Sequence, residues 1–144
     1  MENQQNGQSS TMPVMIDKVA WILIQDGKVL SARSKGKDLY YFPGGKREPG
    51  ESDTETLVRE IEEELTVRIK PDTVRPFGIF EAEADGKAAG VRVRMVGYTA
   101  DYEGQLTPAA EIEELAWLGE NDRNQVSAVS QLVFDVVYGT CRKA

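Results

Sequence analysis

The sequence predicts an α+β fold in a single domain, because strand-like and helix-like segments follow one another without regular alternation. Short apolar segments have the composition or the alternation of strands at 19–24, 28–33, 39–42, 77–83, 91–100 and 115–118. Two segments, at 53–65 and 121–137, carry apolar residues at helical spacing. The length of 144 residues and the hydrophobic content of 40% suit one domain with a substantial core.

The ends and turns of these segments carry local signals. Residues 1–12 are rich in Gln, Asn and Ser, which predicts a disordered tail before a single domain at 13–144. The Asp-Gly pair at 26–27 lies between two apolar segments and predicts a hairpin turn. The Asn-Asp pair at 121–122 precedes valines at helical spacing, so we expect it to cap the last helix.

Composition argues against several classes of protein. A net charge of −7 argues against general nucleic-acid binding, which needs a basic surface. The chain has no histidine, so carboxylates must do any general-base or metal-binding work. The longest apolar run near the start, 19–24, is far too short to span a membrane. The single cysteine, Cys141, cannot form an internal disulfide, so we expect a cytoplasmic protein.

The clearest helix lies at 53–65. Ser52 and Glu55 have the spacing of a capping box, in which the serine oxygen accepts a backbone N–H and the glutamate reaches back. Apolar residues follow at four-residue spacing from position 57 to position 65 and form one stripe. We therefore expect a helix that starts at Ser52 and packs this stripe against the core.

The same helix carries Glu60, Glu63 and Glu64 within an arc of about 100°. The simplest interpretation is a solvated acidic face. However, Glu60 and Glu64 repel each other by about 0.2–0.5 kcal/mol, and the helix dipole disfavours anions in the C-terminal half. A divalent cation would reverse both penalties, and carboxylate oxygens suit Mg²⁺ or Mn²⁺. The pattern therefore favours a metal site that binds substrate phosphates.

The spacing around these glutamates resembles the Nudix box, G-x5-E-x7-R-E-U-x-E-E-x-G-U, in which U is an apolar residue. Gly45, Glu51 and the run 59–67 match the box at every position except one. Thr66 stands where the box has glycine, which would supply a left-handed helix end. We expect this change to alter how the helix ends, at a cost of about 1 kcal/mol, without removing a metal ligand.

The resemblance implies a MutT-like Nudix hydrolase with an α/β/α sandwich around a mixed sheet. It also implies that Glu60, Glu63, Glu64 and the backbone carbonyl of Gly44 ligate Mg²⁺, or Mn²⁺ in its place. Glu111 lies six residues before a tryptophan, a relation that implies a further metal ligand. The alternative for Glu111 is a solvated acidic turn, since two more glutamates follow it closely.

The resemblance assigns further roles within the box. Glu60 is the predicted general base, although other family members use a glutamate from a later loop. Arg59 and Glu63 complete the predicted catalytic group. Glu51 and Arg59 are expected to form an ion pair that fixes the loop against the helix, and Gly45 has a structural role.

Basic and aromatic side chains near the box are candidates for substrate binding. We single out Arg33 and Lys46 for the phosphates and Tyr41 for stacking on a base. Each has a simpler alternative role, as a surface charge or as packing within a strand.

The segment after the box lacks the residues that mark ADP-ribose and diadenosine polyphosphate hydrolases in this family. By elimination we predict a nucleoside triphosphate substrate, cleaved to a monophosphate and pyrophosphate. The alternatives are a nucleotide sugar or dinucleotide substrate, and a nucleotide-sensing domain without turnover. An isoprenoid diphosphate isomerase is a weaker alternative, because it needs a catalytic cysteine in its sheet. Many family members are dimers, so we include a homodimer among the expectations.

Overall fold

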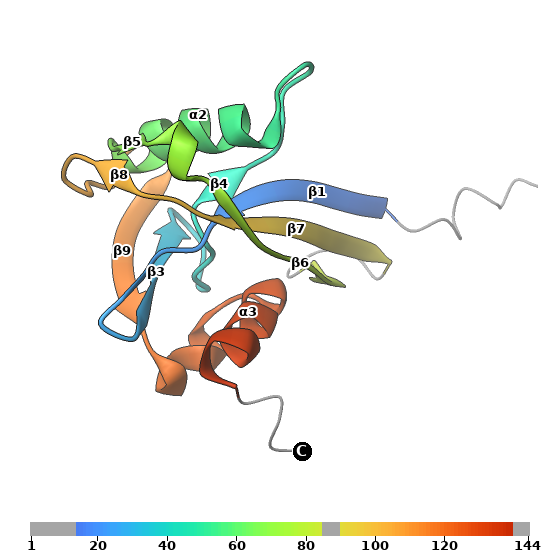
Figure 1. The fold of residues 1–144 in the computed structure, drawn as a ribbon. Helices are drawn as coiled ribbons and strands as arrows, with labels where there is room; N and C mark the ends of the chain where they lie inside the picture. The colour runs from blue at the N-terminus through green and yellow to red at the C-terminus, as the bar shows by residue number, and fades with distance from the viewer. Residues whose placement is uncertain (1–13, 85–89, 140–144) are drawn as a thin grey trace, which may run out of the picture.

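The computed structural model describes residues 14–84 and 90–139 of the chain. The predicted tail at 1–12 and Cys141 lie outside these residues. Figure 1 shows the strands between two helices, α2 and α3. Within the described residues, no helix is long and apolar enough to cross a membrane.

The strands follow the chain in the order β1 (Val14–Trp21), β2 (Ile24–Gln25), β3 (Lys28–Ser34), β4 (Gly44–Gly45), β5 (Arg68–Ile69), β6 (Arg75–Glu83), β7 (Val91–Thr99), β8 (Tyr102–Glu103) and β9 (Ile112–Leu118). The α-helices are α2 (Asp53–Leu65) and α3 (Ala128–Tyr138), and short 3₁₀ helices span Pro71–Thr73 and Glu120–Gln125.

The central sheet has the strand order β4-β1-β7-β6. Strands β1 and β7 are parallel, whereas β4 pairs antiparallel with β1 and β6 pairs antiparallel with β7. Two smaller antiparallel sheets contain β2-β3-β9 and β5-β8. The mixed central sheet and its covering helices confirm the predicted α+β class.

Each face of β1 belongs to a different core cluster, because successive side chains of a strand point to opposite sides. Ala20, together with Ile22 just after the strand, packs with residues of α3. Val19 and Trp21 pack with the apolar stripe of α2. This division places one helix on each side of the sheet (Figure 1), which confirms the expected α/β/α sandwich.

Several predicted boundaries were wrong. The strand expected at 19–24 begins earlier, at Val14, and ends at Trp21. Only Ile24–Gln25 pairs with β3 across the Asp-Gly turn, because β1 itself joins the central sheet. The turn has the expected left-handed backbone, with φ of 53° at Asp26 and 76° at Gly27.

Two further segments also differ from expectation. Residues 39–42 do not form a strand and make isolated bridges instead, one from Tyr41 to Ala32 and one from Tyr40 to Val126. The last helix is not capped at 121–122, where the chain forms a 3₁₀ helix. It begins after Ser127, whose side chain accepts the N–H of Ser130.

Candidate active site

Helix α2 presents the acidic side chains, and its start and core face are as expected. Ser52 accepts the N–H of Glu55 at 3.1 Å, and the Glu55 carboxylate accepts the N–H of Ser52 at 2.9 Å. Leu57, Ile61 and Leu65 are fully buried against the sheet. This apolar anchoring fixes the rotation of the helix, and hence the direction in which its glutamates point.

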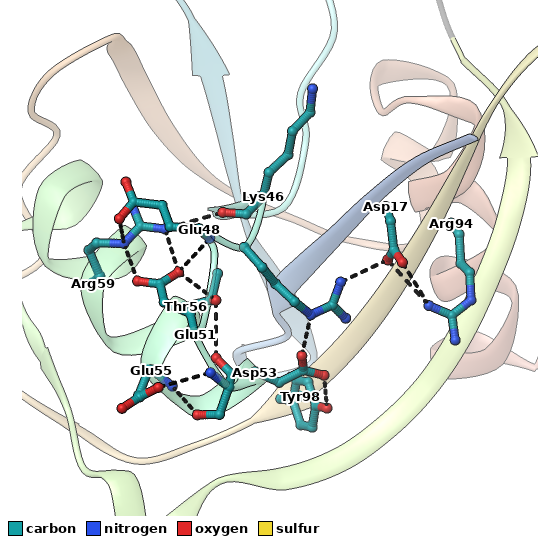
Figure 2. Close-up of polar contacts among 12 residues, drawn as sticks. Asp17, Lys46, Glu48, Glu51, Asp53, Glu55, Thr56, Arg59, Arg94 and Tyr98 are labelled. Atoms are coloured by element: carbon teal, nitrogen blue, oxygen red, sulfur yellow. Dashed lines mark hydrogen bonds and ion pairs between the residues drawn. The ribbon is translucent and has the colours of Figure 1, made fainter. Parts of the chain in front are cut away.

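The predicted ion pair between Glu51 and Arg59 is present and bidentate (Figure 2). Arg59 Nε and Nη2 donate to the two Glu51 oxygens at 2.6 and 2.9 Å. Arg59 Nη2 also donates to the Lys46 carbonyl at 3.1 Å, and its Nη1 donates to Glu60 at 3.0 Å. Arg59 lowers the pKa of Glu51 to about 2. One guanidinium therefore ties the loop before α2 to a candidate catalytic carboxylate.

A second ionic network holds the other side of this loop (Figure 2). Arg47 pairs with Asp53 at the start of α2 and with Asp17 of β1, the latter at 3.2 Å. Arg94 of β7 donates to Asp17 at 3.2 Å, and the Tyr98 hydroxyl donates to Asp53. The loop is thus fastened to both the helix and the central sheet.

The box glycine, Gly45, and the glycine before it, Gly44, lie against the glutamates. The Gly44 N–H donates to Glu64 Oε1 at 3.1 Å. A Cβ atom at position 45 would meet the Glu60 carboxylate at 2.5 to 2.7 Å. Gly45 therefore leaves the space that Glu60 occupies, which gives a physical reason for its predicted structural role.

Burial perturbs two of the predicted metal ligands. It raises the pKa of Glu64 to about 7, against the opposing effect of the Gly44 N–H, and the charges of Glu60 and Glu111 add to the rise. Burial also raises the pKa of Glu60, although Arg59 opposes this change. Glu63 is more than half exposed. Close, partly desolvated carboxylates of this kind are stabilised by a cation.

In the described residues, the glutamates do not converge into a cluster of three or more metal-binding side chains. Arg59 draws Glu60 toward itself and lies 3.7 Å from Glu63, while Glu64 points toward Gly44. The donor set nevertheless suits a hard cation, because Glu64 and Glu60 offer partly buried carboxylate oxygens, and Glu64 lies beside the Gly44 backbone. Mg²⁺ fits such a site, since it binds through a few carboxylates and retains several waters.

A cavity of about 270 Å³ opens beside this acidic end of α2. Gly44 and Glu64 line one part of it, and Tyr41 contributes to its wall. The remaining lining is largely apolar and comes from β1, β3, β7, the start of β9, the start of α3 and the segment before β4. It includes Ile16, Phe42, Val93, Ile112 and Val129. The cavity joins a polar, acidic end to an apolar interior, as a nucleotide site requires.

One of the three predicted substrate-binding residues lines the cavity. Tyr41 lies in the cavity wall, whereas Arg33 and Lys46 do not line it. Arg33 instead pairs with Glu114 at 2.7 Å and Glu113 at 3.5 Å. The charge of Arg33 is therefore neutralised by two glutamates of β9, and its role in phosphate binding stays a prediction.

Sequence reasoning missed Lys18, which lines the cavity from β1. Its Nζ lies 5.3 Å from the centre of the Tyr41 ring. The missed signal was the alternation of Ile16, Lys18 and Ala20, which places one charge on an otherwise apolar strand face. It went unseen because the strand was expected to begin at Val19.

The end of α2 corrects one expectation. Thr66 adopts the left-handed conformation itself, with φ of 67° and ψ of 19°. Its N–H donates to the Glu62 carbonyl, and its hydroxyl donates to the Thr107 carbonyl at 3.1 Å. The helix therefore ends as it would with glycine, and the expected change in the helix end was wrong.

Comparison with known proteins identifies the family. The model of the NUDIX domain matches residues 15–130. The CTP pyrophosphohydrolase of Escherichia coli (strain K12) is 34% identical over 116 residues, which cover 77% of this chain and 81% of that protein. The chain therefore belongs to the Nudix hydrolase family and is a pyrophosphohydrolase.

Solved structures agree with this assignment. The solution structure of the E. coli ORF135 protein has a TM-score of 0.68 and 28% identity, covering 92% of this chain and 94% of that chain. The crystal structure of a MutT protein from Bacillus halodurans has a TM-score of 0.65 and 24% identity, covering 84% and 81% of the two chains. The second likeness is one of fold.

Proposed function

We propose that this protein hydrolyses a nucleoside triphosphate to a monophosphate and pyrophosphate with Mg²⁺ as the cofactor. The observation that carries the proposal is the cavity, in which the partly buried carboxylate of Glu64 and the Gly44 backbone adjoin an apolar interior wide enough for a base. The pyrophosphohydrolase relative, which acts on CTP, supports a triphosphate over a nucleotide sugar or a dinucleotide.

Glu60, Glu63, Glu64 and the Gly44 carbonyl would hold the cation, with Glu111 close enough to Glu64 to influence its charge. When bound, Mg²⁺ neutralises charge on the phosphate oxygens and lowers the pKa of water, and Mn²⁺ supplies the same chemistry.

The protein's own groups then act on the proton and on the geometry. As a water oxygen attacks phosphorus, the bond to the pyrophosphate oxygen breaks and a Glu60 oxygen takes the water proton. Burial raises the pKa of Glu60, which makes its carboxylate a better proton acceptor. Arg59 donates to that carboxylate at 3.0 Å and so orients it. Tyr41 and its apolar neighbours exclude bulk water from the nucleotide base in the cavity.

The first experiment measures phosphate release from nucleoside triphosphates, nucleotide sugars and dinucleotides, with Mg²⁺ or Mn²⁺ and coupling enzymes. We expect turnover of triphosphates that chelators abolish. Metal binding without turnover of any compound would instead support the nucleotide-sensing alternative.

Substitution of Glu64 tests the proposed metal ligand. Glu64→Gln should lower kcat by at least 100-fold with little loss of stability, because it removes a ligand but relieves the burial of a charge. Glu62→Gln is the matched control, since Glu62 lies on the same helix and is exposed. Near-native turnover in Glu64→Gln, or equal loss in both variants, would contradict the assignment.

The proposal also places the reaction in the cytoplasm and includes a homodimer. Cell fractionation and analytical ultracentrifugation of the full chain test these two points separately from activity.

A further inference from the structure

The face of β1 that lines the cavity carries one charge. Lys18 shares this face with Ile16 and Ala20, and its neighbour across the parallel pair is Met95 of β7. Met95 in turn pairs with Phe80 of β6. Side chains of directly paired residues lie on the same side of a sheet, so the lysine is set in an apolar row across the strands.

Lys18 has little compensation for this position. Among the described residues Lys18 makes no ion pair within 4.0 Å, and its Nζ lies 5.3 Å from the centre of the Tyr41 ring. Burial lowers its pKa, while the charge of Glu64 raises it. Removal of an ammonium from water without an acceptor is costly, and in the part of the chain that the structure describes this donor has no hydrogen-bond acceptor.

The position of Lys18 indicates which part of a nucleotide would meet it. The phosphates belong at the acidic end, where Gly44 and Glu64 lie and where the proposed cation would bind. The base then enters the apolar part of the cavity, whose floor includes Ile16 and Val93 of the central sheet. Lys18 lies on that floor next to the aromatic wall formed by Tyr41. A base that stacks on the Tyr41 ring would turn its edge toward the floor and hence toward the ammonium group.

We propose that Lys18 is a specificity-determining residue that donates a hydrogen bond to a carbonyl oxygen on the edge of the substrate base. Cytosine, uracil and guanine carry such an oxygen, whereas adenine has only ring-nitrogen acceptors and places an amino group where guanine has its carbonyl oxygen. This inference rests on the proposed function and narrows its substrates to triphosphates whose base has a carbonyl oxygen.

The test compares wild-type protein with Lys18→Met, which keeps an unbranched chain of similar size and removes the donor. Lys28→Met is the matched control, because Lys28 is exposed and does not line the cavity. We measure kcat and KM for CTP, UTP, GTP and ATP. For the preferred carbonyl-bearing nucleotide, Lys18→Met should lower kcat/KM by about 10- to 100-fold, mainly through a higher KM. The same substitution should change kcat/KM for ATP by less than about 3-fold.

An equal loss of kcat/KM in Lys18→Met for all four nucleotides would overturn the proposal, because it would show that Lys18 contacts the phosphates that all four share. Unchanged kinetics, or a wild-type preference for ATP, would overturn it as well. An equal effect of Lys28→Met would show a general loss of charge rather than recognition of a base.

A binding measurement separates this inference from the proposed reaction. Calorimetry with CMP, UMP, GMP and AMP in the presence of a chelator needs neither metal nor turnover. We expect wild type to bind a carbonyl-bearing monophosphate more tightly than AMP, and Lys18→Met to lose that difference. If the wild type hydrolyses no triphosphate, the proposed function fails, while these binding data still decide the role of Lys18.

Discussion

Replacement of Gly45 by alanine should separate activity from stability. The added Cβ would lie 2.5 Å from Glu60 Cδ and Oε2 and 2.7 Å from Oε1. These atoms are the free end of a flexible side chain, so a rotation of Glu60 relieves the overlap. An off-rotamer side chain costs about 0.5–1.5 kcal/mol, and a full rotamer change costs less. We therefore expect Gly45→Ala to lose less than about 1 kcal/mol of stability.

The effect on catalysis should be far larger. Relief of the overlap moves the Glu60 carboxylate by roughly 1 Å, away from its contact with Arg59. A displacement of this size in a catalytic group costs about 100-fold in rate. We expect kcat to fall by about that factor.

The neighbouring glycine is the matched control. A Cβ at Gly44 would lie 2.0 Å from the backbone oxygen of Val19 and 2.9 Å from the Ala20 Cα, at φ of +145°. Backbone atoms of the central sheet cannot rotate away, so Gly44→Ala should cost about 3 kcal/mol or more. For a chain of this size, that loss lowers Tm by roughly 10 °C.

The assay measures kcat/KM on the best triphosphate together with Tm and urea unfolding for both variants. Gly45→Ala with native kcat would refute the assignment of Glu60. Equal destabilisation by the two substitutions would refute the geometric argument that distinguishes the glycines.

Three further outcomes follow from the same contacts. Because Arg59 lowers the pKa of Glu51 to about 2, this carboxylate should stabilise the protein above its ordinary pKa near 4.5, and the contribution should fade as the pH falls toward 2. Glu51→Gln should then be less stable than wild type in urea at pH 7, with the gap closing at low pH; a gap independent of pH would contradict this. Arg59→Lys should lower kcat and the free energy of unfolding, because lysine cannot make the bidentate pair with Glu51. Native values of kcat and of the free energy of unfolding would show that the bidentate pair is dispensable. Thr66 has a φ of 67°, which glycine adopts without strain, so Thr66→Gly should raise the free energy of unfolding by up to about 1 kcal/mol. The lost hydrogen bond from the Thr66 hydroxyl to the Thr107 carbonyl reduces this gain. A clear fall in the free energy of unfolding would show that this hydrogen bond outweighs the backbone strain.

Much of the box could be predicted because its signals are local. Ser52 and Glu55 lie three residues apart, and the buried stripe repeats every four, so the backbone of one helix decides where these side chains point. The pair of Glu51 and Arg59 also lies within eight positions of the chain. The Asp-Gly turn formed as expected for the same reason, since its left-handed backbone depends on two adjacent residues.

Other features of the site depend on segments that lie far apart in the chain. Tyr40 and Tyr41 look like strand residues, but each bridges a different distant segment, Tyr41 to Ala32 of β3 and Tyr40 to Val126 before α3, so no continuous ladder forms. Arg33 looked available for phosphates, yet the register of β3 against β9 brings it to Glu114, 81 positions away. Nothing near Arg33 in the chain indicates that pairing.

The residue types and spacing of the chain by themselves thus determined the family motif, the acidic helix and the loop pair that orients it. The arrangement of the strands decided the rest of the site. The parallel pairing of β1 with β7 brings Asp17 to Arg94 and sets Lys18 beside Met95, across more than seventy positions of sequence. Such pairings depend on which apolar faces meet in the core, and no local pattern reports that choice. The residues of the box can therefore be identified from the sequence. The cavity, and the position of Lys18 in it, depend on how the strands of the central sheet pair.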